Sequence, residues 1–583
     1  ADLALTEETM GKVKDIFRSP EYKKVENDIE DFVKQKLQNY IPADTGKKTI
    51  HDPVWGSVDY SEWEMQIIDS PLFQRLRDIN QVGLAMLTYP AARHSRFEHS
   101  LGVASAAKIM CDKIDKNSDN FKIPERNKNA IVLAALLHDI GHCFYSHLSE
   151  TIYGELKDFA EVRKKFSEIL ELKPKPHEIL SFMIVNTGTF KEFFFRYVNY
   201  PEKGSVRQTL FPDVGCMIIG KSIEREGRIQ SYQTSLINGP FDADKLDYIK
   251  RDSLTAGLTL QYDMERLFTK IQVHSIASSQ SVIEDRLVIN FNGVTAIEEL
   301  TFCKIMLFSY IYYHQKVLIS EMMIKDYVFG LYKLSFIKSF SDFLTYTDSD
   351  ILKLGRKQKG QNPFPEYGML NLEELADNIH NRKLPRRCFE VSQGNVVAVR
   401  SEDGEAKALE YCADILSQCR DASREFTAGD LKNAMLSFSA LLMKDDEVKL
   451  DLLTGDLRDM TYTEMLEKRK EFYDEFVKEY KNQGKNVNFT LFDIYVVFPK
   501  LVNYGAANEE VVLGKDHHKL MTIHEFVKLD HWAGSFNSNK WRGYVFVSDK
   551  IDKNISFEVS ERLVLKGKAK LKNPMAYLKG IDY

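Results

Sequence analysis

Hydrophobic residues recur with helical spacing in several stretches of the chain. Apolar positions within residues 25–33 fall on one side of an amphipathic helix, and the uninterrupted apolar run at 130–137 indicates a buried helix face. Beyond residue 486 the pattern changes to β-branched and aromatic runs at 489–498 and 542–547, which is typical of strands. We therefore predict a mostly α protein with a helical body and a smaller α+β C-terminal lobe.

The chain has 583 residues, which is longer than one ordinary domain, and changes of composition divide it into several parts. Proline and glycine in residues 48–60 predict a turn or short hairpin, and 409–416 and 462–480 are the clearest helical periods later in the chain. The predicted parts are an N-terminal helical segment at 1–47, a domain holding the polar motifs at 48–330, a helical extension at 331–485 and the α+β lobe at 486–583.

Composition narrows the class of protein. The 79 basic and 85 acidic residues leave a net charge of −6, which disfavours indiscriminate binding of nucleic acid. The seven cysteines include no CxxC pair, so reduced thiols in a cytoplasm explain them better than a zinc ribbon or a disulfide framework. No apolar run approaches the roughly 18 residues of a membrane span, and residues 1–8 do not resemble a signal peptide. We expect a cytoplasmic protein.

A dense polar cluster follows directly after the apolar run. His138 and Asp139, adjacent at the helix end, could coordinate one cation through an imidazole nitrogen and a carboxylate oxygen. His147 and Glu150 are spaced i, i+3, so on a helix they would share a face and could act as a proton-transfer pair. The alternative is a helix end that carries solvated histidines.

A second motif occupies residues 238–252. Asp244, Tyr248 and Asp252 recur at i, i+4 and i+8, so one helix face could offer two carboxylates and a phenol. A charge-rich surface helix is the alternative. His99, in an earlier predicted helix, would supply a third metal ligand if it faced the His-Asp pair, although a lone histidine of this kind is more often an ordinary core residue.

Four motifs follow one another in order between residues 48 and 317. They are DPVWG at 52–56, IIDSPLFQRLRDINQVG at 67–83, RFEHSLGV at 96–103 with HDIGHxxxSH at 138–147, and DADKLDYxxRD at 242–252. In this order they resemble the HD-superfamily deoxynucleoside triphosphate (dNTP) triphosphohydrolases, both the catalytic core of the vertebrate member with a sterile-alpha-motif domain and the bacterial dGTPases. The resemblance implies a helical HD phosphohydrolase core at 48–330 and an oligomer or effector region within 331–485.

The resemblance also implies a reaction and a metal. The substrate would be a dNTP cut at the α-phosphorus, which releases deoxynucleoside and inorganic triphosphate. A divalent cation would be required, and a His/Asp site admits manganese, magnesium, iron, zinc or nickel. The implied metal ligands are His99, His138, Asp139 and Asp244. The implied catalytic residues are His147 as acid, Glu150 as the group that orients it, and His142 and His177 on the phosphates.

Substrate contacts follow from the same motifs. Arg96, Lys245 and Tyr248 match phosphate contacts, Gln81 and Asp252 match positions that hold the sugar 3′ hydroxyl, and Tyr313 matches a ring packed where a 2′ hydroxyl would sit. These matches predict a preference for deoxyribose over ribose.

One position departs from the family pattern. Ile305 stands where relatives have an arginine on the terminal phosphate, and the adjacent Lys304 could replace it only from a helix face about 100 degrees away.

An effector site is implied as well. Asp69, Gln74 and Arg77 match residues that read an activating guanine, and Lys48 matches one on its phosphates. From spacing alone, Gln74, Arg77 and Gln81 could equally be a solvated helix face. Arg382 and Arg386 resemble a basic pair contributed across a subunit interface. Basic residues of a second activator site are replaced here by phenylalanine and glycine at 291 and 293. We expect a homo-oligomer, as dimer, tetramer or hexamer, with one dNTP or GTP effector site.

The sequence therefore predicts a metal-dependent dNTP triphosphohydrolase, activated by nucleotides, that serves in dNTP pool control or antiviral defence. One alternative is an HD phosphohydrolase or phosphodiesterase that acts on another nucleotide or on single-stranded nucleic acid. Another is a non-catalytic nucleotide sensor. The presence of all four implied metal ligands and of the His147/Glu150 pair favours an enzyme.

Overall fold

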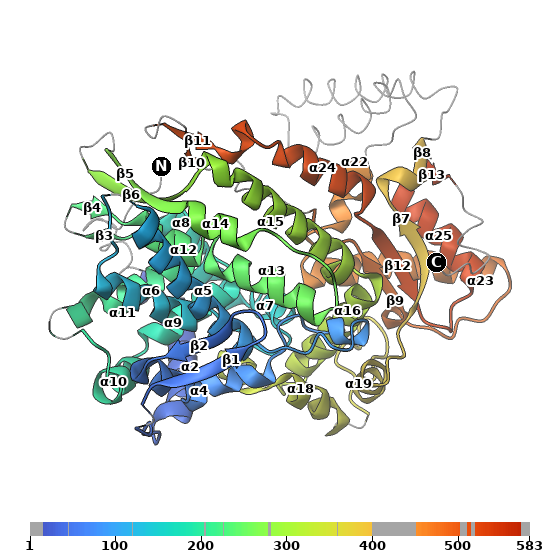
Figure 1. Cartoon of the computed structure of the whole chain (residues 1–583). Helices are drawn as coiled ribbons and strands as arrows, with labels where there is room; N and C mark the ends of the chain where they lie inside the picture. Colours follow the sequence, from blue (N-terminus) through green and yellow to red (C-terminus); the bar gives the residue numbers. More distant parts are fainter. Residues whose placement is uncertain are drawn as a thin grey trace, which may run out of the picture. The chain divides into compact units, whose positions relative to one another are not determined.

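The computed structural model describes residues 16–572, apart from residues 45, 119, 203, 205, 226, 278–281, 358–359, 399–449, 502–509 and 515–518. The helix predicted at 409–416 lies outside the described residues. The chain forms two compact units (Figure 1). The first takes in the described residues up to 363, with 371–382 and those between 503 and 533. The second takes in residues 364–370, the described residues from 383 to 502, and those from 534 onward.

The predicted mostly α class is confirmed, and local signals explain where helices begin. In α2 (Pro20–Leu37), the Ser19 hydroxyl accepts the Tyr22 N–H and Pro20 occupies the first turn. The apolar side predicted within residues 25–33 is buried in this helix. The predicted hairpin is also present, as β1 (Lys48–Asp52) paired antiparallel with β2 (Gly56–Tyr60).

Five helices of the first unit carry the polar motifs. They are α5 (Arg96–Asn117), α6 (Glu125–Leu137), α7 (His147–Tyr153), α9 (Pro176–Asn186) and α13 (Ala243–Thr255). A capping box of Ser95 and Glu98 starts α5, and the Asp242 side chain caps α13 by accepting the Lys245 N–H. α5 packs against both α6 and α13 (Figure 1). At Gly102 of α5 a Cβ atom would lie 1.9 Å from Asp247 Oδ1, so only glycine lets α13 approach this closely.

Besides α2, the first unit has further α-helices in the described residues. They are α3 (Glu62–Ile68), α4 (Pro71–Gln74), α8 (Lys157–Leu170), α10 (Gly188–Tyr197), α11 (Val206–Ile219), α12 (Ser231–Ile237), α14 (Met264–Lys270), α15 (Val294–Leu307), α16 (Gln315–Lys333), α17 (Phe340–Thr345), α18 (Asp348–Leu354) and α19 (Leu372–His380). None of the helices in the described part of the chain is long and apolar enough to cross a membrane.

The sheet of the first unit is built from distant segments. β5 (Ile271–Ala277) pairs antiparallel with β6 (Ile283–Asn290), and β6 pairs in parallel with β10 (Glu510–Leu513) and β4 (Arg228–Ile229). β11 (Leu520–Thr522) and β3 (Glu224–Arg225) extend the two edges. β10 and β11 thus belong to the first unit, although they lie in the segment predicted as a C-terminal lobe.

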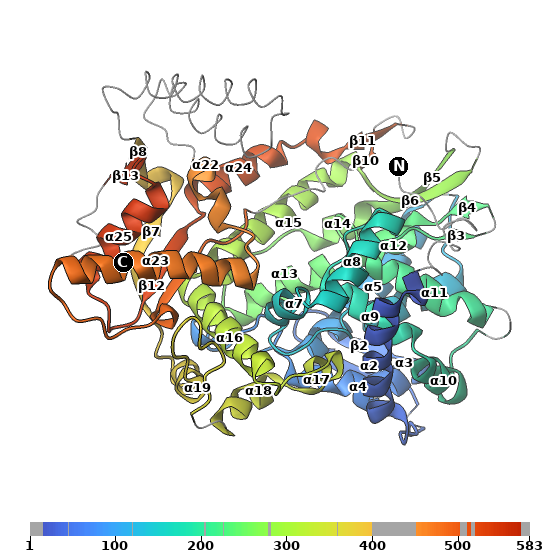
Figure 2. The same ribbon diagram turned by 180° about the vertical axis from the view of Figure 1, so that it is seen from behind.

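The second unit centres on a three-stranded antiparallel sheet in the order β7 (Arg386–Val391), β12 (Gly543–Val547), β9 (Ile494–Val497). The strand predictions at 489–498 and 542–547 are confirmed in these shorter spans. α23 (Tyr462–Asn482) and α25 (Lys553–Leu565) pack on the sheet, as Figure 2 shows from behind. The remaining elements are β8 (Val396–Ala398), β13 (Ala569–Leu571) and α22 (Leu450–Thr454), and α24 (Leu529–Asn539) spans the point where the chain passes from the first unit to the second.

Candidate active site

Four side chains of the metal-ligand type converge from three helices. His99 lies in the first turn of α5, His138 and Asp139 follow α6 directly, and Asp244 lies in the first turn of α13. The Nε2 atom of His99 is 3.0 Å from Asp244 Oδ1 and 3.5 Å from Asp139 Oδ2. The Nε2 atom of His138 is 3.3 Å from Asp139 Oδ1 and 4.0 Å from Asp244 Oδ1. The fold thus brings together the four residues that the sequence motifs single out.

Both imidazoles are oriented in the way that metal-binding histidines usually are. His99 Nδ1 lies 2.8 Å from Asp247 Oδ2, and His138 Nδ1 lies 2.8 Å from the carbonyl oxygen of Ala135. The two Nε2 atoms are buried and make no hydrogen bond within the described part of the chain. An Nδ1–H that donates to an acceptor leaves the Nε2 lone pair available to a cation. This cluster therefore fits a divalent metal ion.

The carboxylates dominate the electrostatics of this cluster. Burial lowers the pKa of His99, but the nearby carboxylates of Asp244 and Asp247 outweigh it and raise the pKa to about 10. Burial raises the pKa of Asp139, but His138 and Arg96 hold it well below its usual range. In the metal-free protein the positive charge that balances these carboxylates is therefore partly a proton on His99, which a cation could replace.

A second cluster lies beside the first and centres on Glu150. Its Oε1 atom is 2.7 Å from His147 Nδ1, 2.9 Å from His177 Nδ1 and 3.5 Å from His142 Nδ1. The His142 and His177 rings stack with centroids 4.0 Å apart. His147 is 62% exposed whereas Glu150 is buried, so the carboxylate orients a histidine that faces solvent.

His142 joins the two clusters, because its Nε2 atom lies 3.2 Å from Asp139 Oδ1. The pKa values of two histidines of the second cluster are shifted in opposite directions. Burial and the nearby Arg96 keep the pKa of His142 well below its ordinary value. Burial also lowers the pKa of His177, but the carboxylate of Glu150 more than offsets it, so this pKa is raised. His177 therefore takes up a proton more readily than the His142 ring that stacks on it.

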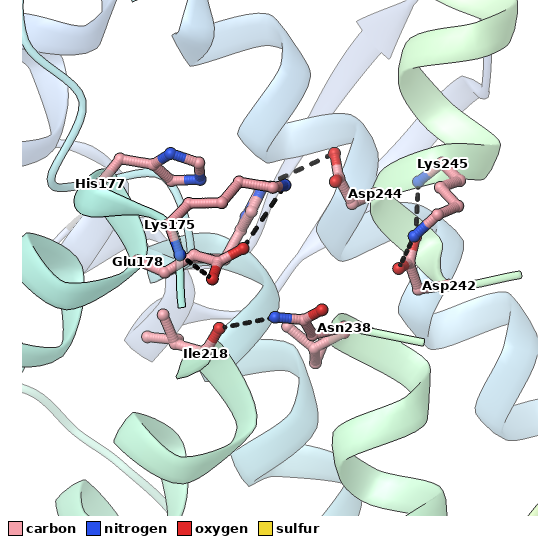
Figure 3. Close-up of a pocket in the computed structure, with 10 residues that line it drawn as sticks. Lys175, His177, Glu178, Ile218, Asn238, Asp242, Asp244 and Lys245 are labelled. Atoms are coloured by element: carbon pink, nitrogen blue, oxygen red, sulfur yellow. Dashed lines mark hydrogen bonds and ion pairs between the residues drawn. The ribbon is translucent and has the colours of Figure 1, made fainter. Parts of the chain in front are cut away.

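A pocket opens next to the first cluster (Figure 3). His177 and Lys175 reach into it from the start of α9, and Asp244 and Lys245 reach in from α13. Lys245 Nζ donates to the Gly239 carbonyl oxygen at 2.7 Å and to Asp242 Oδ2 at 2.6 Å. The lining residues are His138, Lys175, His177, Glu178, Ile218, Ile237, Asn238, Asp242, Asp244 and Lys245. The pocket mixes basic and acidic groups, so its charge balance would turn positive on binding a cation.

Lys304 belongs to the same neighbourhood. Burial and the charges of Lys245 and Lys175 lower the pKa of Lys304 to about 8. The amines of Lys245 and Lys175 are therefore close enough to Lys304 to repel its charge. Ile305, the residue that departs from the family pattern, is buried in the core. Tyr248 is half-buried, one helical turn after Asp244 on α13.

Two predicted sugar contacts, Gln81 and Asp252, lie in one buried network. Asp252 Oδ1 is 2.8 Å from His94 Nε2, and Oδ2 accepts the Tyr312 hydroxyl at 2.5 Å. The Gln81 N–H donates to the His94 carbonyl oxygen at 3.0 Å. Its buried Oε1 has no hydrogen-bond partner among the described residues, so it is available to a ligand hydroxyl. Tyr313 follows the turn that carries Tyr312.

Arg96 is held inside the site by four groups, one of which is the Gln81 carbonyl oxygen, 3.3 Å from Nη2. Its Nη1 donates to Asp139 Oδ2 at 2.6 Å and its Nε to Ser146 Oγ at 2.9 Å, while Nη2 lies 3.4 Å from His147 Nε2. The guanidinium thus contacts both clusters. Before substrate binds, one of its edges is occupied by the carboxylate of Asp139.

The residues predicted for an effector are paired with one another or with the backbone. Lys48 Nζ lies 3.0 Å from Asp69 Oδ2. Arg77 donates from Nε to Gln74 Oε1 at 2.7 Å, and its guanidinium carbon lies 3.6 Å from the Phe97 ring centroid. In the first unit, Arg382 donates from Nε to the Leu87 carbonyl oxygen at 2.7 Å. In the second unit, Arg386 donates to the Ile551 carbonyl oxygen.

Sequence reasoning missed the residues that support these side chains. Asp247 lies within the DADKLDY motif, and its position three residues after Asp244 was the available signal. Lys175, two residues before His177, could have been found from its place at a helix start. Asn80 lies within the motif at 67–83, whereas His94, Tyr312 and Asp348 carry no local signal, because they reach the site only through tertiary contacts.

Comparison with known proteins agrees with this geometry. Residues 96–191 match the family model of the HD domain. This segment of the chain is therefore similar to an HD domain. The matched segment supplies most of both clusters, while Asp244 comes from α13, outside the segment.

The chain is also similar to several whole proteins. It is 29% identical over 280 residues to a deoxynucleoside triphosphate triphosphohydrolase SAMHD1 homolog of Dictyostelium discoideum, and 30% identical over 279 residues to an uncharacterized protein of Methanocaldococcus jannaschii. Both matches cover 48% of this chain and 48% of the relative, so the chain spans about half the length of each. A crystal structure of a hypothetical protein from Aquifex aeolicus shares the fold, with a TM-score of 0.54 and 19% identity over 88% of this chain and 100% of that one.

Proposed function

We propose that this chain is a metal-dependent phosphohydrolase that converts dNTPs to deoxynucleoside and inorganic triphosphate. The observation that carries the proposal is the pair of buried, unpartnered Nε2 atoms of His99 and His138, which face Asp139 and Asp244 beside the Glu150 cluster. The similarity to a dNTP triphosphohydrolase homolog supports the choice of substrate class.

The first cluster holds the metal in this proposal, with His99, His138, Asp139 and Asp244 as ligands. A divalent ion bound there would polarise the phosphate and lower the pKa of a bound water. Asp247 and the Ala135 carbonyl group keep the two imidazoles turned so that Nε2 faces the ion. Both clusters group residues with metal-ligand spacing, but the imidazoles of the second are largely engaged with Glu150.

Proton transfer falls to His147. Hydrolysis at the α-phosphorus forms a bond from a water oxygen to phosphorus and breaks the bond to the 5′ oxygen, which then needs a proton. Glu150 accepts a hydrogen bond from Nδ1 of His147, so Nε2 is the nitrogen that would present a proton to the leaving oxygen. Arg96, at 3.4 Å from that Nε2, would favour release of the proton.

The remaining groups bind the substrate. His177 favours its charged form and lines the pocket with Lys175 and Lys245, so these residues would hold phosphate oxygens, with His142, Arg96, Tyr248 and Lys304 nearby. Gln81 would accept a hydrogen bond from the sugar 3′ hydroxyl through its unpartnered Oε1. Asp252, fixed by His94 and Tyr312, would act with it, and Tyr313 would exclude ribose.

Regulation by nucleotides is part of the proposal. Lys48, Asp69, Gln74 and Arg77 would bind a dNTP or GTP effector in a homo-oligomer, with Arg382 and Arg386 contributed by a neighbouring subunit. Such an enzyme would serve dNTP pool control or antiviral defence.

The test compares three variants of the full chain with wild type, after chelation and after re-addition of Mn²⁺. His138→Ala should lose bound metal and activity together. His147→Asn should keep the metal and lose about 10²- to 10⁴-fold in kcat. His51→Ala, which changes an exposed histidine of the hairpin, is the matched control and should match wild type. Activity that survives chelation, or that survives in His138→Ala, would contradict the proposal.

A further inference from the structure

The turn that leads into α7 has an unusual backbone. Tyr145 and Ser146 both adopt positive φ, at 53° and 52°, a region that side chains other than glycine seldom occupy. Both residues are buried. The turn separates Asp139 and His142 from His147, so its conformation fixes how the two clusters face each other. Such a conformation persists only when surrounding groups hold it.

Asp348, at the start of α18, holds this turn from a distant part of the chain. Its Oδ1 accepts the Tyr145 N–H at 2.6 Å, and its Oδ2 accepts the N–H and the side-chain Nδ2 of Asn80 at 3.0 and 2.8 Å. The Tyr145 hydroxyl in turn donates to the Asp348 carbonyl oxygen at 2.9 Å. A buried carboxylate with three N–H donors is a strong and directional anchor.

The hydrogen bonds continue from Asn80 to the metal cluster. The Asn80 carbonyl oxygen accepts the Ser146 hydroxyl at 2.6 Å, and Ser146 Oγ accepts Arg96 Nε at 2.9 Å. Arg96 then donates to Asp139 at 2.6 Å. An unbroken series of bonds thus runs from α18 through the turn to a proposed metal ligand.

Arg75 holds the other side of the same loop. Its buried guanidinium donates to the carbonyl oxygens of His142, at 2.9 Å, and of Ile140. A cation therefore binds loop carbonyl groups, and the carboxyl group of Asp348 accepts a loop N–H group. The loop is thus held from both sides.

We propose that Asp348 is a positioning residue that fixes the Tyr145–Ser146 turn and thereby places His147 on Glu150 and Arg96 on Asp139. The proposal rests on the proposed function, because it assigns the turn a role in that reaction. It makes α18 part of the catalytic unit, although α18 lies far beyond the segment that matches the HD domain. Asp348 itself touches no reacting atom.

The experiment compares Asp348→Asn with wild type by two readouts. Amide hydrogen exchange of the peptide that covers residues 143–150 should speed up about tenfold or more, because an asparagine has one acceptor oxygen in place of the two that bind Tyr145 and Asn80. The kcat for dNTP hydrolysis should fall about tenfold or more while KM and Mn²⁺ affinity stay within about threefold, because His147 is misplaced and the metal ligands remain.

Asp285→Asn is the matched control. Asp285 is equally buried, and its carboxylate binds Arg228 and Ser275 instead of any site residue. This variant should lose thermal stability, but the hydrogen exchange of residues 143–150 and the kcat should stay as in wild type. Asn80→Ser, which removes one bond to Asp348 and leaves the carboxylate in place, should show both effects more weakly and serves if Asp348→Asn does not fold.

Each outcome decides the matter. Unchanged exchange at 143–150 in a folded variant would overturn the anchoring role, and faster exchange with unchanged kcat would overturn the catalytic one. A loss of thermal stability like that of Asp285→Asn, with exchange at 143–150 and kcat unchanged, would reduce Asp348 to a structural residue. If wild type cleaves no dNTP, the proposed function fails. The exchange measurement still tests whether Asp348 holds the Tyr145–Ser146 turn.

Discussion

At the scale of single residues, the protonation of one imidazole decides whether the site accepts a metal ion. Asp247 binds His99 Nδ1 and is itself fixed by two hydrogen bonds from Arg251, at 2.8 and 2.9 Å. Nε2 therefore faces the other carboxylates. Their charge overcomes the burial that lowers the pKa of His99 and raises it to about 10, so Nε2 carries a proton at neutral pH in the metal-free protein.

Metal affinity should therefore rise with pH. A cation must displace the His99 proton, so Mn²⁺ should bind about tenfold more tightly for each unit between pH 6.5 and 8.5, and calorimetry in two buffers should detect about one released proton. The charge on His99 stabilises the metal-free fold fully below pH 6.5, and this contribution is lost as pH rises toward 10. An affinity that is flat over this range would refute the assignment of His99.

Lys175 should matter for phosphate binding. Its side chain lines the pocket and is 59% exposed, so it can move to meet an anion. We expect Lys175→Ala to raise KM for dNTPs about tenfold with a smaller change in kcat, since it removes one charge-assisted contact. Lys173→Ala, an exposed lysine two residues earlier, is the control and should behave as wild type. Equal effects of the two substitutions would remove Lys175 from the site.

At the scale of elements, the loop after α6 and the start of α9 must lie almost in contact. Gly141 permits this, because a Cβ atom there would lie 2.4 Å from the Ser181 nitrogen and 2.6 Å from the His177 carbonyl oxygen. The glycine therefore does more than follow the end of a helix. It lets the backbone that carries His177 reach the cluster around Glu150.

Gly141→Ala should be costly for that reason. We expect a loss of about 3 kcal/mol in the free energy of unfolding, measured by urea denaturation, because the extra methyl group meets rigid backbone. The remaining folded protein should also lose activity, since α9 must shift away. Gly455→Ala has nothing within 4 Å of the added Cβ atom and should be nearly neutral. Equal stability of the two variants would contradict this packing.

Elements with local signals could be predicted from the sequence, and elements with distant partners could not. Ser19 and Pro20 mark the start of α2, and the periodicity at 462–480 matches α23, because caps and amphipathic spacing are local. The pairing of β10 with β6 joins residues more than 200 positions apart. The local pattern of hydrophobic residues gives no information about such a distant partner. The same holds for Asp348, whose partner Tyr145 precedes it by 203 residues.

At the scale of the whole molecule, the HD domain does not make the site alone. The segment 96–191 carries the histidine clusters, whereas Asp244, Asp252 and Asp348 come from later helices of the first unit. The motifs single out four side chains that the fold brings together, and their role as metal ligands stays a prediction. The motifs did not indicate how this set is positioned, because Asp247 lies within a motif but its contact with His99 is tertiary, and Asp348 lies outside every motif.

The measurement that tests the central claim most directly is the identity of the products. The full chain would be incubated with each of the four dNTPs and four NTPs, with Mn²⁺ or Mg²⁺, alone and in pairs, and the products separated by anion exchange. We predict deoxynucleoside and intact inorganic triphosphate from dNTPs only, with cleavage stimulated in mixtures if an effector binds. Monophosphate with pyrophosphate, or no cleavage in any mixture, would contradict the account.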